Sequence, residues 1–215
     1  MRYQITFILL TILIVFINSQ ELVAEAGTAK DSSDWKLRKD RNGIRVWTRD
    51  HKKEGILEYL SKITIETNLE TLIDIIQDVD KYPDWTENCE TASTHKILSD
   101  TSRIEYMTTK VPWPLEDRDV AMEFVVVKNS DTYFQANLTS APEAVPLSDD
   151  YLRIEISQGS WIFKKKDDNR VEVIHQFLSD PGGNIPKWIV NMFIVSGPYK
   201  TLDNLKHLCS KAKDQ

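Results

Sequence analysis

Apolar residues in the last third of the chain recur at spacings of three and four, which is typical of one face of an α-helix. Pro186 suits the first helical turn, whereas Gly197-Pro198 interrupts a helix because proline lacks the backbone N–H. The sequence therefore predicts a long apolar helix with a kink at residues 196–198, which either packs the core or closes as a lid over a cavity. The expected apolar stripe comprises Ile185, Trp188, Met192, Val195, Tyr199, Leu202 and Cys209.

Upstream of this helix, apolar and polar residues alternate in a series of segments, which is typical of half-buried β-strands. Asn42-Gly43 predicts a hairpin turn between the first two strands, because both residues tolerate positive φ. The expected strands are residues 35–39, 43–49, 56–67, 94–98, 103–111, 120–128, 132–139, 151–165 and 170–178.

Two short helical segments are expected between the third strand and the fourth. Asn68 is a good N-cap for a helix that runs through Leu72 and Ile76, and residues 80–85 predict a turn or a second short helix. The order of elements predicts a single α+β domain. In it, a curved antiparallel β-sheet is wrapped around a long C-terminal α-helix, with a small helical insert after the third strand.

The N-terminal segment has the composition of a targeting signal. A short basic start is followed by an apolar run at residues 5–17 and by the small-x-small motif Ala24-Glu25-Ala26. The run is shorter than the roughly 20 residues that a membrane-spanning helix needs. We therefore expect an exported protein, periplasmic or secreted, with an uncleaved N-terminal membrane anchor as the alternative. The expected division is a signal peptide at residues 1–26, a linker at 27–34 and the folded domain at 35–210.

Charge and cysteine content narrow the function classes. The chain carries a formal net charge of −6 over 215 residues and contains no basic run. Nucleic-acid binding is therefore not expected, because it needs clustered Lys and Arg. Cys89 and Cys209 could pair in an oxidising compartment, although two separate thiols are the default expectation. The composition fits one globular domain, which we expect to be a monomer.

The chain lacks the sequence motifs of common catalytic and metal sites. None of its four histidines forms a zinc-like pattern with a His, Cys or carboxylate three or four residues away, so neither a metal nor a cofactor is expected. His175 alternates with Val173 and Phe177 on one strand face, where we expect a hydrogen-bonded strand histidine. The charged cluster at residues 116–119 is better explained as a structural anchor than as a catalytic group, with Arg118 paired to a carboxylate. These observations favour binding over catalysis.

Four stretches of the chain follow one another in a characteristic order. They are Tyr82-Pro83-x-Trp85, then WPLEDRD at residues 113–119, then residues 152–154 with Trp161, and finally DPGGNIPKWIVN at residues 180–191. Together they resemble the START domains, the steroidogenic-acute-regulatory-related lipid-transfer family, over about residues 35–208. The resemblance implies the helix-grip fold, in which a curved antiparallel sheet and a long C-terminal helix enclose a tunnel for one lipid.

The resemblance also implies roles for individual positions. Residues 140–150 correspond to an Ω-loop that gates the tunnel together with the C-terminal helix. Glu105 corresponds to an acidic residue that sterol-binding members place in the cavity beside an arginine of the next strand. Phe124 stands at the position of that arginine, which disfavours sterol recognition through a buried ion pair. Glu105 is then expected to be protonated, hydrogen-bonded or exposed.

We therefore expect a carrier of one hydrophobic ligand (a sterol, a phospholipid or a fatty acid) that contacts membranes transiently. One alternative is an aromatase/cyclase-like enzyme, for which only Glu105 and His175 offer acid–base groups. Another is a scaffold whose cavity is filled by side chains. The expected ligand cavity comprises Glu105, Met107, Phe124, Ile154, Ile156, His175, Ile189, Met192, Phe193 and Ser196. The expected gate and hinge residues are Pro142, Pro146, Gly182, Gly183, Gly197 and Pro198.

Overall fold

A β-sheet is the largest element of the computed structural model, which describes residues 34–50, 57–183 and 185–213. The signal peptide expected at residues 1–26 lies outside the described residues, as does the expected linker except for Asp34. The described strands are β1 (Lys36–Arg41), β2 (Ile44–Asp50), β3 (Leu57–Glu66), β4 (Cys89–Ser99), β5 (Ser102–Thr109), β6 (Arg118–Ser130), β7 (Tyr133–Ser140), β8 (Leu152–Arg153), β9 (Ile156–Asp167) and β10 (Arg170–Asp180).

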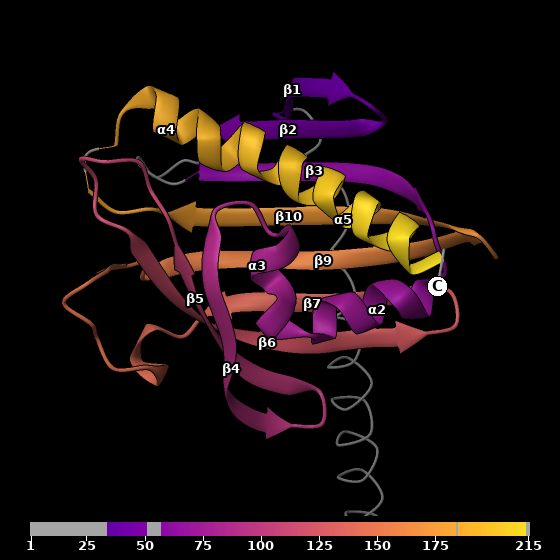
Figure 1. The fold of residues 1–215 in the computed structure, drawn as a ribbon, viewed down its shortest axis with the longest axis horizontal. Helices are drawn as coiled ribbons and strands as arrows, with labels where there is room; N and C mark the ends of the chain where they lie inside the picture. Colours follow the sequence, from indigo (N-terminus) through magenta and orange to yellow (C-terminus); the bar gives the residue numbers. More distant parts are fainter. Residues whose placement is uncertain (1–33, 51–56, 184, 214–215) are drawn as a thin grey trace, which may run out of the picture. The chain divides into compact units, whose positions relative to one another are not determined.

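These strands form one ten-stranded sheet in the order β1-β2-β3-β10-β9-β7-β6-β5-β4 (Figure 1). Neighbours along this order pair antiparallel, and the short β8 pairs in parallel with β6. The predicted hairpin turn between β1 and β2 is confirmed, because Asn42 and Gly43 have φ values of 55° and 78°. β3 therefore lies beside β10, the last strand of the chain, which is the pairing that a sheet curved around a C-terminal helix requires.

Short helices follow β3, as predicted. They are α2 (Leu69–Gln77), the 3₁₀ turn η1 (Val79–Lys81) and α3 (Tyr82–Trp85), and a further 3₁₀ turn, η2 (Pro142–Ala144), lies in the loop after β7. Asn68 caps α2, and its side chain accepts a hydrogen bond of 2.8 Å from the Thr71 N–H. Figure 1 shows α2 and α3 on the same face of the sheet as the C-terminal helix. Within the described part of the chain, no helix has the length and apolar character to cross a membrane.

The C-terminal helix contains a π-helical turn. It consists of α4 (Lys187–Asn191), the π turn η3 (Met192–Ser196) and α5 (Gly197–Lys213). The Gly197 N–H donates to the Met192 carbonyl oxygen, which is the five-residue step of a π-helix. Pro198 then has no N–H to donate. The irregularity therefore lies directly before the Gly197-Pro198 pair at which the sequence predicts a kink.

This π turn changes which residues of the helix are buried. A stripe at α-helical spacing cannot run unbroken through a turn that contains an extra residue. The predicted stripe is accordingly wrong at Trp188, which is 56% exposed, whereas its neighbour Ile189 is fully buried. The stripe also omits Leu205, which is buried together with Leu202 on the face of α5 that meets the sheet.

The hydrophobic core lies between the helices and the inner face of the sheet. Leu72 of α2 and Leu202 of α5 are buried in it beside Val173 of β10. Phe134 and Phe163, on neighbouring strands, stack with ring centroids 5.4 Å apart. Burying large apolar side chains of this kind contributes about 1.5–3 kcal/mol each. Among the described residues, Cys89 and Cys209 are not joined by a disulfide.

The strand expected at residues 151–165 is divided in two. The Leu152 and Ile154 N–H groups donate to carbonyl oxygens of Asp117 and Asp119, next to or in β6. β9 instead pairs with β7 and β10. The chain leaves one strand and joins two others between residues 153 and 156, which breaks the alternation of side chains and shifts its phase.

Gly159 is required by the close approach of two strands. A Cβ at this position would overlap the Phe177 ring and lie 2.7 Å from the Gln176 carbonyl oxygen. We expect Gly159→Ala to lower the free energy of unfolding by about 1–3 kcal/mol, because it overpacks the inner face. Urea denaturation followed by circular dichroism measures this. Ser160→Ala, one position along β9 on the other face, is the control, and equal stabilities of the two variants would contradict the prediction.

Candidate functional site

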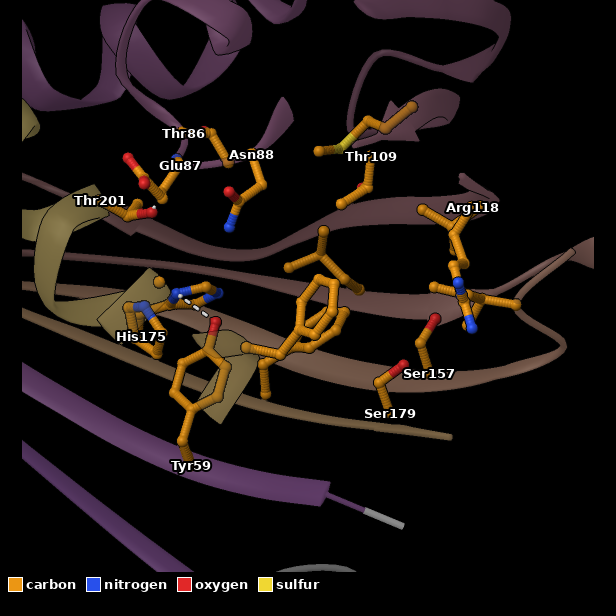
Figure 2. A pocket seen from close by; sticks show the side chains of 18 of the residues that line it. Tyr59, Thr86, Glu87, Asn88, Thr109, Arg118, Ser157, His175, Ser179 and Thr201 are labelled. Atoms are coloured by element: carbon orange, nitrogen blue, oxygen red, sulfur yellow. Dashed lines mark hydrogen bonds between the residues drawn. The ribbon is translucent and has the colours of Figure 1, made fainter. Parts of the chain in front are cut away.

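A cavity of about 190 Å³ lies between the inner face of the sheet and the C-terminal helix (Figure 2). Strands β3, β5, β6, β7, β9 and β10 provide one side, and α3, η3 and α5 provide the other. Most of the lining is apolar, as expected for a site that encloses a hydrophobic molecule. The apolar lining residues include Met107, Val120, Met122, Leu138, Ile154, Trp161, Phe177, Phe193 and Ile194.

Polar side chains of the lining gather in two groups. Figure 2 shows Tyr59, His175 and Thr201 on one side, together with the segment of residues 86–88. Arg118, Ser157 and Ser179 form a second group at the opposite end of the view. Unlabelled apolar side chains fill the space between them in the figure. A ligand in this cavity would therefore meet polar groups at its ends and apolar groups along its length.

The first group is built on a neutral histidine. His175 Nδ1 lies 3.2 Å from the Tyr59 hydroxyl, and its ring stacks on Trp161 with centroids 3.7 Å apart. Burial lowers the pKa of His175 to about 3, because the charged imidazolium would lose its hydration. Burial likewise raises the pKa of Tyr59 far above its ordinary value. Both rings are uncharged at neutral pH and act as hydrogen-bonding groups.

The second group contains a cation. Arg118 begins β6, and its guanidinium donates to the backbone carbonyl oxygens of Glu116 and Pro181. Burial lowers its pKa, while the nearby charges of Glu116 and Asp117 act in the opposite direction. The sequence predicts that Arg118 pairs with a carboxylate. The structure shows that backbone carbonyl groups hold Arg118 instead, and no ion pair joins it to a carboxylate within the described residues.

Two lining residues each have a buried polar atom with no hydrogen-bond partner among the residues that the structure describes. These atoms are Trp85 Nε1 and Ser157 Oγ, and both residues are 2% exposed. Among the described residues, the Glu105 carboxylate supplies the third buried side-chain atom of this kind. Buried polar groups in proteins are nearly always hydrogen-bonded, so each exception needs an explanation. In a cavity wall, the explanation is a bound water molecule or a ligand atom.

The cavity brings together four of the ten expected ligand residues. Met107, Ile154, His175 and Phe193 belong to its lining, and so do the expected hinge residues Gly197 and Pro198. Whether they contact a ligand stays a prediction. The other expected ligand residues lie outside this lining: Glu105, Phe124, Ile156, Ile189, Met192 and Ser196.

The two irregularities of the fold explain several of these displacements. Ile154 and Ile156 would share a face in a continuous strand, but the break between β8 and β9 puts Ser157 into the lining and leaves Ile156 37% exposed. On the C-terminal helix, the residues in the lining are Phe193, Ile194, Gly197, Pro198 and Thr201. Met192 and Ser196, which belong to the π turn, are not among them.

Glu105 lies beneath the helical insert rather than in the cavity. Its carboxylate pairs with Arg103 of the same strand at 2.6 Å and accepts a hydrogen bond of 3.3 Å from the Tyr82 hydroxyl. Arg103 also donates to the Gln77 side chain at 2.6 Å, and its guanidinium lies 4.0 Å from the centre of the Phe124 ring. Burial raises the pKa of Glu105 to about 6, against the opposing effect of Arg103.

This network corrects one expectation and agrees with another. Because Phe124 stands at the position of the arginine on the next strand, the sequence disfavours sterol recognition through a buried ion pair at Glu105. The arginine is instead two residues away on β5, where alternate side chains share a face. Glu105 is hydrogen-bonded, as one of the expected options required. Phe124 is fully buried and forms the surface on which Arg103 rests.

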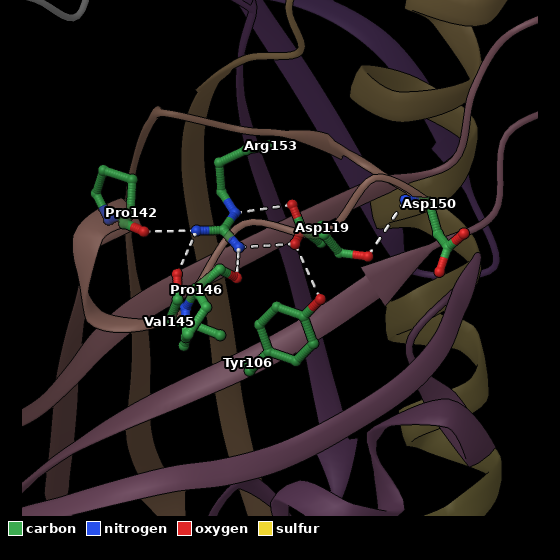
Figure 3. A network of polar contacts seen from close by, with 8 residues as sticks. Tyr106, Asp119, Pro142, Val145, Pro146, Asp150 and Arg153 are labelled. Carbon is green, nitrogen blue, oxygen red and sulfur yellow. Dashed lines mark hydrogen bonds and ion pairs between the residues drawn. The ribbon is translucent and has the colours of Figure 1, made fainter.

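A second buried ion pair holds the loop at residues 140–150. Arg153 pairs with Asp119 through two hydrogen bonds of 2.8 Å. The Asp119 carboxylate also accepts a hydrogen bond of 2.9 Å from the Tyr106 hydroxyl. The same guanidinium donates to the carbonyl oxygens of Pro142, Val145 and Pro146 (Figure 3). The two prolines expected as gate residues are therefore tied to β6 through one arginine. Asp119 raises the pKa of Arg153, which keeps this clamp charged.

The turn after β10 carries the remaining expected gate residues. Gly182 and Gly183 have φ values of 66° and 71°, a left-handed conformation that side chains disfavour. The Gly182 N–H donates to the Asp180 carboxylate at 3.0 Å, which closes the turn. The Pro181 carbonyl oxygen in this turn accepts from Arg118. The turn thus connects the end of the sheet to α4 and forms part of the cavity wall at Pro181.

Sequence reasoning missed several residues of the lining. Trp85 and Trp161 belong to the family-like stretches, but nothing local indicates that their rings face one cavity. The contact of Tyr59 with His175 depends on the pairing of β3 with β10, which the sequence does not specify. Ser157 has no sequence signal of its own, because its orientation depends on where β9 begins.

The neutral His175 makes folding stability depend on pH. An unfolded histidine takes up a proton near pH 6.5, whereas the folded one does so only near pH 3. Acidification below about 6.5 therefore favours the unfolded chain, by about 3 kcal/mol at pH 4. We expect the stability difference between the wild type and His175→Gln to change by this amount, in disfavour of the wild type, when chemical denaturation is measured at pH 7 and at pH 4. Parallel pH curves for the two proteins would contradict this, and His207→Gln on the exposed side of α5 is the control.

Comparison with known proteins agrees with this architecture. The START domain family model matches residues 18–214. An uncharacterized protein of Pseudomonas aeruginosa is 28% identical over 182 residues, which cover 84% of this chain and 89% of the relative. The human phosphatidylcholine transfer protein is 24% identical over 183 residues, covering 82% of this chain and 84% of that protein.

A solved structure gives the same result. The crystal structure of a STAR-related lipid transfer protein from Xanthomonas axonopodis superposes with a TM-score of 0.74 at 26% sequence identity. The match covers 83% of this chain and 99% of that one. The fold is the one that the sequence predicts, with an antiparallel sheet, a small helical insert after the third strand and a long C-terminal helix. The chain therefore belongs to the START domain family.

Proposed function

We propose that this protein holds one hydrophobic molecule (a sterol, a phospholipid or a fatty acid) in the cavity and carries it between membranes or to a partner. The observation that carries this proposal is the cavity itself, in which apolar walls enclose polar atoms that have no hydrogen-bond partner among the described residues. Such a site gains free energy by removing apolar ligand surface from water, at about 25 cal/mol per Å². The names of the relatives, which include lipid transfer proteins, support the same conclusion.

The size of the cavity bears on how a ligand enters. Its volume of about 190 Å³ lies below the roughly 300–1,000 Å³ of typical small-molecule sites. A two-chain lipid therefore requires the cavity to widen. The segment that can widen it is the C-terminal helix at Phe193 and Gly197, where the π turn interrupts the regular hydrogen bonds. The loop at 140–150 is the second candidate, and its movement requires Arg153 to release its carbonyl partners.

Transient membrane contact is part of this proposal. Three large apolar side chains are strongly exposed: Trp113, between β5 and β6, is 90%, Leu147, in the loop after β7, is 78%, and Trp188, in α4, is 56% exposed. Tryptophan favours the interface between water and lipid, because its ring is apolar and its N–H is polar. Figure 1 shows α4 and the loop after β7 near the same end of the sheet. Contact at this end would place α4 and the loop after β7 against the membrane.

The enzyme alternative finds less support in the chemistry of the lining. Its two acid–base candidates were Glu105 and His175, and Glu105 is not part of the lining. His175 keeps a pKa of about 3, so it is not charged in the range where general acid–base catalysis operates. Its hydrogen bond to Tyr59 joins two neutral groups. This pair is better suited to orienting a ligand than to transferring protons.

Native mass spectrometry of the protein, followed by organic extraction, tests the carrier function. We expect a co-purifying lipid, or the uptake of one equivalent from a panel of sterols, phospholipids and fatty acids. Phe193→Asp should abolish this uptake, because it places a charge in the apolar wall. Ser160→Ala lies on the outer side of β9 and should retain it. A wild-type protein that stays ligand-free against the whole panel would instead favour the scaffold alternative.

Vesicle binding tests the proposed membrane contact. Trp188→Ala should weaken binding to phosphatidylcholine vesicles severalfold in a flotation assay, because it removes an interfacial side chain. Ile97→Ala removes an apolar side chain of similar exposure, 65%, from β4. The contact surface would have to lie elsewhere if both variants bound vesicles as the wild type does, or if Ile97→Ala were the weaker one.

A further inference from the structure

Three polar residues at one end of the cavity have unused hydrogen-bonding capacity. Arg118 lies at the start of β6, and Ser157 and Ser179 are direct partners in the pairing of β9 with β10. Figure 2 shows the two hydroxyl groups and the Arg118 guanidinium at the same end of the cavity, and the Pro181 carbonyl that Arg118 contacts is two residues beyond Ser179. We call these three residues the Arg118 cluster. Neither the catalytic alternatives nor the loop clamp assigns it a role.

The charge of this cluster is not balanced by a direct partner. Arg118 is 3% exposed and donates to two backbone carbonyl oxygens, which orient the guanidinium but carry no net charge. The nearest carboxylates have other positions or partners. Glu116 is exposed. The Asp117 carboxylate accepts a hydrogen bond of 2.8 Å from the Val111 N–H, and the Asp180 carboxylate accepts one of 3.0 Å from the Gly182 N–H. A buried cation without an ion-pair partner is costly unless something supplies the negative charge.

The hydroxyl groups add donors of the right kind. Ser157 is 2% exposed, and within the described part of the chain its Oγ has no hydrogen-bond partner. A serine hydroxyl donates one hydrogen bond and a guanidinium donates five in a planar fork. Oxygen atoms of a carboxylate or a phosphate accept several such bonds at once, and charge-assisted bonds of this type are about twice as strong as neutral ones. The cluster therefore has the chemistry of an anion site.

We propose that the Arg118 cluster binds the anionic headgroup of the lipid, a carboxylate or a phosphate, while the apolar middle of the cavity takes the acyl chain. This proposal rests on the proposed carrier function, and it specifies which end of the cavity holds the headgroup of the lipid. The opposite end, with the neutral pair Tyr59 and His175, offers no positive charge to an anion. A ligand held by its charge at Arg118 would extend its chain past Phe177, which lies between Ser179 and His175 on β10, towards the end with Tyr59 and His175.

Paired ligands that differ only in charge test this proposal. Oleic acid is compared with methyl oleate, and phosphatidic acid with diacylglycerol, in equilibrium binding assays. We expect the wild type to prefer the charged member of at least one pair, and that pair identifies the headgroup as a carboxylate or a phosphate. Ser157→Ala should reduce this preference severalfold, and Arg118→Gln by about tenfold or more, as expected for hydrogen bonds to a charged group. Ser160→Ala, on the outer face of β9, should leave the preference as in the wild type.

The outcomes separate this proposal from the carrier function. Equal affinity of the wild type for both members of each pair, or a preference that persists in Ser157→Ala, would overturn the anion site while lipid binding stands. No binding of any of the four lipids would overturn the carrier function as well. Arg118 also holds the turn at Pro181, so its variant can lose stability. Ser157→Ala removes a hydroxyl that hydrogen-bonds to none of the residues described by the structure, and it decides the question if Arg118→Gln does not fold.

Discussion

The inner face of the sheet is apolar across most of its width, and the helices that cross it keep this surface from water. Removing such a surface from water is the main favourable contribution to folding. Leu202 and Leu205 of α5 cover one part, and Leu72 and Ile76 of α2 cover another. The two sets of helices do not fill the whole face, and the cavity is the part left between them. The core and the ligand site are therefore two regions of one surface.

Polar groups are distributed on that surface according to what satisfies them. Glu105 and Arg103 lie under the helical insert, where Tyr82 and Gln77 complete their hydrogen bonds. In the cavity wall the protein leaves donors open, as at Ser157. The Glu105–Arg103 network holds the helical insert to the sheet, whereas the Ser157 hydroxyl would be available to hydrogen-bond a ligand of the proposed carrier. Buried carboxylates and arginines in the same fold thus serve different ends, depending on whether protein or ligand atoms face them.

The order of strands and helices could be predicted from sequence because each element has a local signal. Asn42-Gly43 marks a hairpin, Asn68 marks a helix start, and regular alternation marks the strands. The site was harder to predict, because two non-periodic events decide which side chains face the cavity. One is the π turn, where the expected ligand residues Met192 and Ser196 lie outside the lining. The other is the break before β9, which brings in Ser157. The break before β9 depends on pairing with distant strands. Gly197-Pro198 indicates an irregular helix, but it does not indicate that the irregularity is a π turn.

Adjacent residues of β6 point to opposite sides of the sheet, so the Arg118-Asp119 dipeptide touches two regions at once. Arg118 faces the cavity, and Asp119 binds Arg153, which grips the loop at 140–150. These two contacts share a single peptide unit. In the proposed carrier, a ligand bound at Arg118 and the release of the loop would both act on this peptide unit. Ligand binding and loop position would then be coupled, and by thermodynamic linkage each would change the free energy of the other by the same amount.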